Sequence, residues 1–417
     1  MKRIAIHLSM LLLVISFIRC STETGFPQDY EIATDGTNYF LRTSWENKTV
    51  KQSSDASEIL QYAMDKLAGN GGEIKLHRGE YIINTPVKPA SKVTLRGAGR
   101  STVLLLGDEN TEGIVILMKG LKGSMVSDLS VKTKKPHTGN SGLIMDDCGD
   151  CKVQNVIAQG FAENGFLVKN RTFLSELTDC VSANNGVSGF YFDELTSKGR
   201  GGDYVANLVK GCISYADQVG FRTNTALCVN IIGCLVHQSV HNGFHITNRS
   251  NAIVISGCRT FQIGNNSIQV EKTREINLNG NMFSWHRGHG IVIKGLSWGT
   301  ITGNNIIDTG VRTKDGSLRN GIVLEETNGL QITGNIIYNW GDQVPMKYGI
   351  IEDEKCENNL IVSNNINYFT EKGIVSKGKG TKVQNNVTFG PDAYVGMDRP
   401  NKFPDFDMER IKEFIKE

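Results

Sequence analysis

The stretch LVHQSVHNGFHI (residues 235–246) has two interpretations, and the choice between them decides the fold. Histidines recur in it at every fourth residue: His237, His241 and His245. On a helix this spacing would place three imidazoles on one face, as in a metal site. However, Asn242-Gly243 is a turn signal within the segment, which favours two short strands joined by a turn.

A repeat on both sides of this stretch supports the strands. Its mark is a small or polar residue, then glycine, then alternating apolar residues, as in NGFLV, SGFYF, NGFHI and HGIVI. Undisturbed steps are 23 or 24 residues, and longer steps contain polar insertions such as TSKGRGGDY (196–204). The marked positions are Gly142, Gly165, Gly189, Gly220, Gly243, Ser267, Gly290, Gly321, Gly349 and Gly373.

A second column, of asparagine and cysteine, follows these glycines by about fifteen residues. Stacked coils produce such a column, because an Asn amide bonds the backbone of neighbouring coils and a Cys fills the same slot as a small apolar side chain. A single coil cannot bury its apolar face, whereas a stack can. We therefore predict a solenoid with about three short strands per coil. The column is Asn155, Cys180, Cys212, Cys234, Cys258, Asn281, Asn304, Asn335 and Asn364.

The pattern resembles the right-handed parallel β-helix of the pectate-lyase-like superfamily over residues 53–390. This resemblance implies an all-β, single-domain solenoid of about ten or more coils. Residues 53–83 are similar to the first coils of that superfamily, in which a helix covers the open end and protects the sheet edge. Asp55 and Glu58 predict a capping box for this helix, and Gly69 predicts its end.

The termini lie outside the repeat. Lys2, Arg3 and the apolar run 4–18 precede Cys20, an arrangement that resembles a bacterial lipoprotein signal over residues 1–20. It implies export to the periplasm or outer membrane surface, with membrane contact only through a lipid on Cys20; plain secretion is the alternative. We expect residues 21–52 to be a tether and lead-in.

The C-terminal tail, residues 391–417, leaves the repeat. Its last segment, FDMERIKEFIKE (406–417), has apolar residues at helical spacing. We expect a short helix there that caps the lower end of the solenoid.

The charge balance limits the partners. Without residues 1–19 the chain loses three of its 45 basic residues, which leaves 42 against 43 acidic ones. Such a chain has no broad basic surface for nucleic acid, and an acidic ligand needs a local basic cluster.

Strand alternation locates a candidate cluster. The second residue after each glycine should point outward, and it is polar only on four consecutive coils, at Tyr191, Arg222, His245 and Gln269. With strands about 4.8 Å apart, Arg222 to Gln269 spans roughly 10 Å, the length of one or two sugar rings. Ordinary solvated outward residues are the alternative. Other expected substrate-binding residues are Asp193, Glu271 and Lys294, two positions further along their strands, with His289 at one end and Arg200 in the insertion.

The family resemblance implies two chemistries. In a lyase acting on an acidic, uronate-containing polysaccharide, His245 would be the base, Arg222 the carboxylate partner and Tyr191 the proton donor. A histidine suits the base because its ordinary pKa is near 6.5. Ca²⁺ is a candidate cofactor, with Asp193, Asn224 or Glu271 as ligands.

The second chemistry is hydrolysis, which needs two carboxyl groups about 5 to 9.5 Å apart. Asp193 and Glu271 are three coils apart, roughly 14 Å, which is too far. Glu325 and Asp353 on adjacent coils are the better pair, although Lys294 and Lys377, which flank them in the same column, suggest a charge-compensated ladder instead. A surface lipoprotein that binds glycan without catalysis is the third interpretation.

The four cysteines of the column are expected to be thiols rather than disulfides, whereas the sequence does not assign Cys228 and Cys356. Cys180, Cys212, Cys234 and Cys258 belong to the column, where parallel side chains have poor disulfide geometry. Cys148 and Cys151 form a zinc half-site by spacing, but no second CxxC accompanies them.

Overall fold

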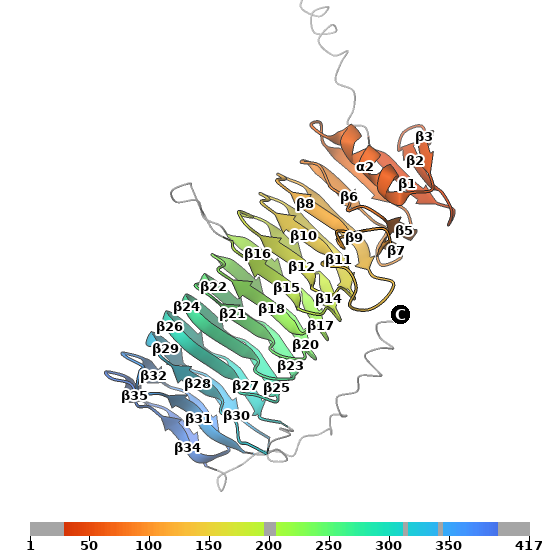
Figure 1. Cartoon of the computed structure of the whole chain (residues 1–417). Coiled ribbons are helices and arrows are strands. Elements are labelled where there is room, and N and C mark those ends of the chain that lie inside the picture. The colour runs from red at the N-terminus through yellow and green to blue at the C-terminus, as the bar shows by residue number, and fades with distance from the viewer. Residues whose placement is uncertain (1–28, 196–205, 312–315, 341–344, 391–417) are drawn as a thin grey trace, which may run out of the picture.

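The computed structural model describes residues 29–195, 206–311, 316–340 and 345–390. These residues form a right-handed parallel β-solenoid of about 12 turns, which confirms the predicted fold class (Figure 1). The predicted signal peptide, Cys20, Arg200 and the C-terminal tail lie outside the described residues. In the described part of the chain, no helix has the length and apolar composition needed to cross a bilayer.

Each central coil contributes one strand to each of three faces, which we call sheets A, B and C in chain order. Sheet A contains β8 (Ile116–Lys119), β10 (Leu143–Asp146), β12 (Asn164–Lys169), β15 (Ser188–Asp193), β18 (Val219–Asn224), β21 (Phe244–Thr247), the starts of β24 (Ile268–Asn279) and β26 (Ile291–Thr302), β28 (Ile322–Glu325), β31 (Met346–Glu352) and β34 (Phe369–Val375). Sheet B contains the start of β11 (Lys152–Gln159), β13 (Glu176–Thr178), β16 (Asn207–Lys210), β19 (Val229–Ile232), β22 (Asn251–Ser256), the ends of β24 and β26, β29 (Asn328–Thr333), β32 (Leu360–Val362) and β35 (Lys382–Gln384).

Sheet C completes each coil. It contains the end of β11, β14 (Val181–Ala183), β17 (Ile213–Tyr215), β20 (Leu235–His237), β23 (Arg259–Ile263), β25 (Met282–His286), β27 (Asn305–Thr309), β30 (Ile336–Tyr338), β33 (Asn365–Asn367) and β36 (Val387–Phe389).

The N-terminal end is closed by a helix and a small antiparallel sheet. Strands β1 (Tyr30–Thr34), β2 (Tyr39–Thr43) and β3 (Thr49–Ser53) are antiparallel, and β1 also pairs in parallel with β4 (Gly72–Leu76). The region expected to be a tether and lead-in therefore contains three strands. The first coils add β5 (Gly79–Ile83), β6 (Val93–Arg96), β7 (Thr102–Leu106) and β9 (Met125–Lys132).

Helix α2 (Ala56–Leu67) covers this end, as predicted, and buries its apolar face. Asp55 caps it by accepting a 2.8 Å hydrogen bond from the Ser57 amide. The predicted capping box is wrong, because the Glu58 carboxylate pairs with Lys51 at 2.6 Å and with Ser53 instead. Lys51, on the preceding strand β3, competes for the Glu58 carboxylate, and the capping signals of the helix do not include this residue.

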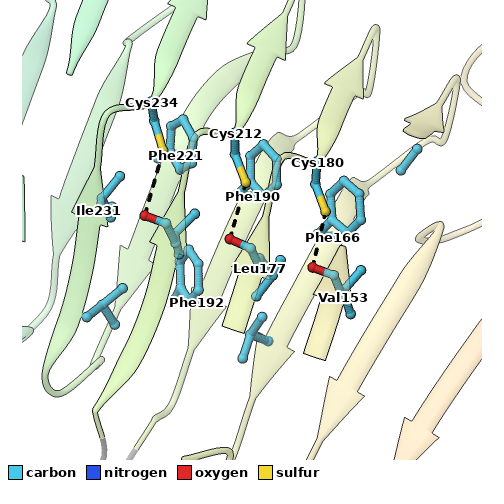
Figure 2. Packing of buried hydrophobic residues seen from close by; sticks show 14 of the residues in the cluster. Val153, Phe166, Leu177, Cys180, Phe190, Phe192, Cys212, Phe221, Ile231 and Cys234 are labelled. Atoms are coloured by element: carbon cyan, nitrogen blue, oxygen red, sulfur yellow. Dashed lines mark hydrogen bonds between the residues drawn. The ribbon is translucent and has the colours of Figure 1, made fainter. Parts of the chain in front are cut away.

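The interior contains columns of identical side chains. Phe166, Phe190, Phe221 and Phe244 stack with ring centroids 4.7 to 5.2 Å apart. Beside them, each thiol of the cysteine column contacts a backbone carbonyl of the preceding coil, as Cys212 contacts Leu177 at 3.4 Å (Figure 2). The described cysteines are free thiols, as predicted for the four in the column.

The glycine column has a steric cause. A Cβ at Gly243 would lie 2.7 Å from the carbonyl oxygen of Ser267 and 2.9 Å from the Thr260 methyl group. The backbones of neighbouring coils approach too closely there for a side chain. Ser267 is tolerated because its hydroxyl bonds to Thr260 at 2.8 Å and to the buried His286 at 3.1 Å.

The asparagine column is a continuous hydrogen-bond ladder. Asn304 donates to the Leu278 carbonyl and to the Asn335 amide oxygen, each at 2.9 Å. Its own amide oxygen accepts from the backbone and side chain of Asn281, at 3.0 and 2.9 Å. The predicted column members from Cys180 to Asn364 lie in the interior. Asn155 does not: it is exposed with φ of 51°, and Val156 occupies the interior position of its coil. Asparagine tolerates the left-handed conformation that this turn requires.

We predict that Asn304→Ala lowers the free energy of unfolding by about 3 kcal/mol, because it leaves several buried polar groups without partners. The exposed Asn328→Ala variant is the matched control. Thermal or chemical denaturation measures both, and equal losses would contradict a structural role for the ladder.

Asp217 has one of the carboxyl groups that lie inside the solenoid. Asp217 accepts hydrogen bonds from the Asn185 backbone and side chain at 2.8 and 2.9 Å and from Ser214 at 2.7 Å. Burial nevertheless raises its pKa to about 6. The folded state therefore holds the proton more tightly than the unfolded state. This contribution to stability is complete below the unfolded pKa and is lost as the pH rises through about 6.

We predict that Asp217→Asn stabilises the protein at pH 8 by up to about 3 kcal/mol and by much less at pH 4. The amide retains an acceptor for Asn185 and places a donor beside Ser214. Melting temperatures at both pH values test this, with the exposed Asp179→Asn as control. A gain that does not change with pH would disprove the buried charge.

Candidate functional site

The four predicted site residues form a ladder on sheet A. Tyr191 pairs in register with Arg222, Arg222 with His245, and His245 with Gln269. All four are partly exposed, and the same position is aliphatic on the flanking strands, at Leu167 and Val292. The structure therefore confirms their predicted outward column on four consecutive strands, β15, β18, β21 and β24.

Arg222 lies between Tyr191 and His245 in the ladder. Its guanidinium carbon is 5.0 Å from the centroid of the Tyr191 ring, a cation–π contact that orients the side chain. Its Nε atom is buried without a hydrogen-bond partner. Among the described residues, no carboxylate lies within ion-pair distance of it, so its charge remains available for an anionic ligand.

Tyr191 is held by Asp193. The phenol donates a 3.1 Å hydrogen bond to Asp193 Oδ1, which also accepts from Asn224 Nδ2 at 2.7 Å. Asn248 in turn donates to the Asn224 amide oxygen at 2.7 Å. Burial, reinforced by the Asp193 charge, raises the pKa of Tyr191 to about 12. The phenol therefore keeps its proton at neutral pH.

His245 is the titratable group of the ladder. Burial lowers its pKa below the ordinary value; the Glu271 carboxylate opposes this shift, and the Arg222 cation adds to it. The imidazole is therefore neutral at pH 7, the state in which a histidine accepts a proton. Its Nε2 atom is buried and makes no hydrogen bond to the protein.

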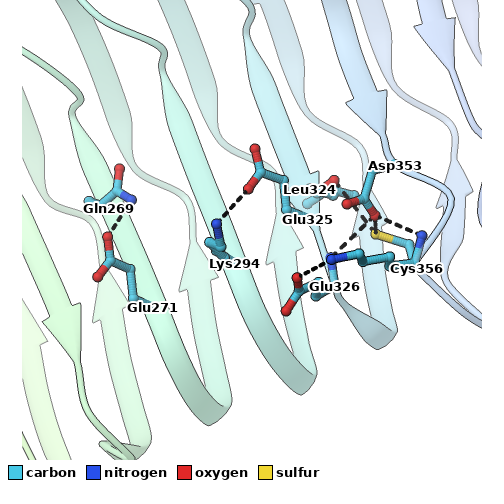
Figure 3. A network of polar contacts seen from close by, with 9 residues as sticks. Gln269, Glu271, Lys294, Leu324, Glu325, Glu326, Asp353 and Cys356 are labelled. Carbon is cyan, nitrogen blue, oxygen red and sulfur yellow. Dashed lines mark hydrogen bonds and ion pairs between the residues drawn. The ribbon is translucent and has the colours of Figure 1, made fainter.

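Gln269 is oriented by neighbours that the sequence analysis did not identify. Asn266 donates to its amide oxygen at 2.7 Å, and its amide nitrogen donates to Glu271 at 3.0 Å (Figure 3). Asn266 in turn accepts from the His289 amide at 2.7 Å. The sequence signal for Asn266 is that it occupies the small or polar position just before the repeat glycine, here Ser267.

His289 belongs to this second chain of contacts. Its Nδ1 accepts a 2.9 Å hydrogen bond from the Asn320 amide, so the proton of the neutral ring is on Nε2. Burial lowers its pKa to about 4. His289 therefore helps to position the Gln269 end of the ladder, and its role as a substrate contact remains a prediction.

The carboxylate pair expected for hydrolysis has other partners. Glu325 forms an ion pair with Lys294 at 3.4 Å (Figure 3). Asp353 lies in the turn after β31, where one oxygen accepts from the Glu326 and Lys355 amides at 3.2 and 3.1 Å. The structure therefore shows charge compensation for Glu325, while Asp353 is held by backbone amides. The pairing of Lys294 with Glu325 offsets part of the charge expected to meet a substrate.

The described residues contain no group of three metal-ligating side chains. Asp193 and Glu271 are three strands apart on sheet A, roughly 14 Å, so they do not fit one Ca²⁺ ion. Cys148 and Cys151 are buried, and their thiols contact the Met118 and Gly149 carbonyls at 3.3 and 3.4 Å. The histidines 237, 241 and 245 lie on two strands and a turn, which excludes the metal helix.

Comparisons with known proteins agree with this geometry. A family model described as "Right handed beta helix region" matches residues 217–388, and the fold defines the chain as a parallel β-helix protein. No curated protein sequence is significantly similar to this chain.

Several solved structures have the same fold. The A-module of the Azotobacter vinelandii mannuronan C-5 epimerase AlgE4 is 16% identical with a TM-score of 0.60, covering 80% of this chain and 95% of that one. DFA-IIIase from Arthrobacter chlorophenolicus A6 is 13% identical with a TM-score of 0.51, covering 74% and 90%. PfbA, a surface adhesin of Streptococcus pneumoniae, is 14% identical with a TM-score of 0.50, covering 81% and 87%. At these identities the similarity shows the fold alone.

We predict that the pKa of His245 responds in opposite directions to its two charged neighbours. Arg222→Gln should raise it, because a nearby cation is removed, and Glu271→Gln should lower it further, because an anion is removed. Proton NMR titration of the imidazole measures both. Shifts of the same sign would show that the ring does not face these groups.

Proposed function

We propose that this protein is an enzyme that removes the C5 proton of a uronate residue in an acidic polysaccharide, and that it cleaves the chain by β-elimination. The observation that carries the proposal is the order of three side chains on adjacent strands. A protonated phenol and a neutral imidazole lie on either side of an arginine that has no carboxylate partner in the described protein.

Each group has a role that its chemistry suits. The Arg222 fork binds both oxygens of the uronate carboxylate and offsets the charge that develops when C5 loses its proton. His245 accepts this proton. The C5–H electron pair becomes the C4–C5 double bond, the C4–O bond breaks, and the departing oxygen takes a proton from Tyr191. Before this transfer, the phenol hydrogen turns from Asp193 to the substrate.

Epimerisation is the second candidate, because it shares the first step. Tyr191 and His245 flank Arg222 on opposite sides, so one group can remove the C5 proton and the other can return one. The similarity in fold to the A-module of a mannuronan C-5 epimerase supports this candidate.

The other interpretations have less support. The carboxylate pair considered for hydrolysis has other partners, because Glu325 pairs with Lys294 and Asp353 accepts from backbone amides. A glycan-binding surface protein would use the same ladder without turnover, and PfbA shows that a surface adhesin can have this fold.

We further propose that the protein is exported and lipid-anchored through Cys20. Metabolic labelling with a fatty acid should mark the wild-type chain and not a Cys20→Ser variant. Labelling that survives the substitution would place the lipid elsewhere.

We predict that His245→Ala and Arg222→Ala each lower activity on uronate polymers at least about a hundredfold, with the melting temperature nearly unchanged. Val323→Ala, in the same column outside the ladder, is the control. Ultraviolet absorbance of the unsaturated uronyl product detects elimination, and deuterium uptake at C5 without cleavage detects epimerisation.

The outcomes separate the interpretations. New reducing ends without the unsaturated product would indicate hydrolysis, and binding without turnover would indicate an adhesin. Wild-type rates in either alanine variant would move the active site elsewhere.

A further inference from the structure

A second column of side chains runs beside the ladder on sheet A, two residues further along each strand, and we call it the charged column. Its centre is neutral, because Asn224 and Thr247 follow Arg222 and His245 on their strands. A carboxylate lies on either side of this centre, and a lysine lies beyond each carboxylate. From β10 to β28 the column is Asp146, Lys169, Asp193, Asn224, Thr247, Glu271, Lys294 and Glu325.

Asp193 is the carboxylate on the β15 side of the centre. Lys169 lies next to it in register but forms its ion pair with Asp146, at 3.7 Å. The hydrogen bonds to Asp193 come from Tyr191 and Asn224, and both fall on Oδ1. In the described part of the chain, no cation lies within ion-pair distance of Asp193, so its charge is not compensated.

Glu271 is the carboxylate on the other side, and it has the same relation to its neighbours. Lys294 lies next to it in register but pairs with Glu325, at 3.4 Å (Figure 3). The hydrogen bond to Glu271 comes from Gln269 and falls on Oε1, at 3.0 Å. Among residues 29–195, 206–311, 316–340 and 345–390, no cation forms an ion pair with Glu271. The ion pairs of the charged column therefore stop on both sides of the ladder.

These two carboxylates lie where the sugars next to a bound uronate would lie. With strands about 4.8 Å apart, Asp193 is one strand from Arg222 and Glu271 is two, roughly 5 and 10 Å along the axis. A glycan that lies along the ladder with its uronate carboxylate at Arg222 places the sugars on either side over β15 and toward β24.

The chemistry of these sugars then matters. A carboxylate that faces Asp193 or Glu271 meets a like charge, which weakens binding. A hydroxyl can instead donate to Asp193 Oδ2 or Glu271 Oε2, neither of which accepts a hydrogen bond from the described residues. Repulsion of the wrong neighbour gives specificity in addition to the contacts with the right one.

We infer that Asp193 and Glu271 are specificity-determining residues that select a uronate flanked by neutral sugars. The substrate is then a polysaccharide in which uronates alternate with neutral sugars, rather than a polymer of uronate alone. This inference rests on the proposed function, because it takes the uronate carboxylate to lie at Arg222. The neutral centre of the charged column agrees with it, since the uronate itself meets no like charge on the strands of Arg222 and His245.

Matched polymers test the selectivity. Carboxyl reduction turns part of the uronates of a polymer into neutral hexoses with the same linkage, so the two forms differ only at C6. Binding to pairs made from several uronate polymers is measured by calorimetry, with His245→Ala in the full chain to prevent turnover. We expect the partly reduced form to bind about tenfold more tightly per remaining uronate.

Two double variants in the same background identify the residues responsible. Asp193→Asn with Glu271→Gln should reduce the preference for the partly reduced form to about twofold or less, because the like charges are removed. Glu176→Gln with Asp179→Asn is the control, because it removes the same charge from β13 of sheet B and the turn that follows it. This control should retain the full preference.

Each outcome separates the inference from the proposed function. Equal binding of the two forms by the parent chain, or a preference that the first double variant retains, would overturn the inference. Tight binding of the fully ionised form that needs added Ca²⁺ and both carboxylates would also overturn it, because uronates would then be held through bound ions. Failure of the proposed function has a different signature: Arg222→Gln would bind the partly reduced form as tightly as the parent chain.

Discussion

The hydrogen-bond ladder at the interior turn between sheets B and C is the constraint on which the rest of the structure depends. In every coil this turn brings backbone amides and carbonyls into an apolar interior, where an unpaired group is costly. Asparagines such as Asn281 and Asn304 satisfy these groups from one coil to the next. In the upper coils the thiols of Cys180 to Cys258 occupy the same positions with weaker contacts and more apolar packing. Because a side chain alternates faces along a strand, a slip of one residue would turn the whole outer column inward. The ladder thus fixes the register.

A fixed register makes the candidate site a rigid array rather than a set of loops. Tyr191, Arg222 and His245 come from residues far apart in the chain but lie at the spacing of adjacent strands. Asp193 orients the Tyr191 phenol on the same strand, and the Tyr191 ring orients Arg222 on the next strand. Such preorganisation is what an active site needs to stabilise charge in a transition state. The pKa shifts have the same origin, since close stacking of the strands removes water from the phenol and the imidazole.

Much of this arrangement followed from the sequence, because a solenoid reduces tertiary structure to a column of equivalent positions. The ladder on sheet A and the cysteine column were both predicted from alternation and period. The failures fall at turns. Asn155 was assigned to the interior column, but its left-handed conformation shifts the interior position by one residue, to Val156. Contacts that join side chains across coils, such as Asn266 with Gln269, depend on rotamers that alternation does not define. The choice between elimination and epimerisation depends on the position of the substrate, and the sequence repeat does not specify that position.

The outer faces of sheets A and C differ in composition, although they belong to the same coils. On β18 the outward residue is Arg222, whereas on β17, a few residues earlier, it is Tyr215. On sheet A the polar residues of this column are confined to four consecutive coils, and this confinement is the observation behind the proposed ligand-binding role. Because the interior ladder already fixes the coils, neither outer face is needed to define the fold. The residues on both outer faces can therefore differ from coil to coil without loss of the fold.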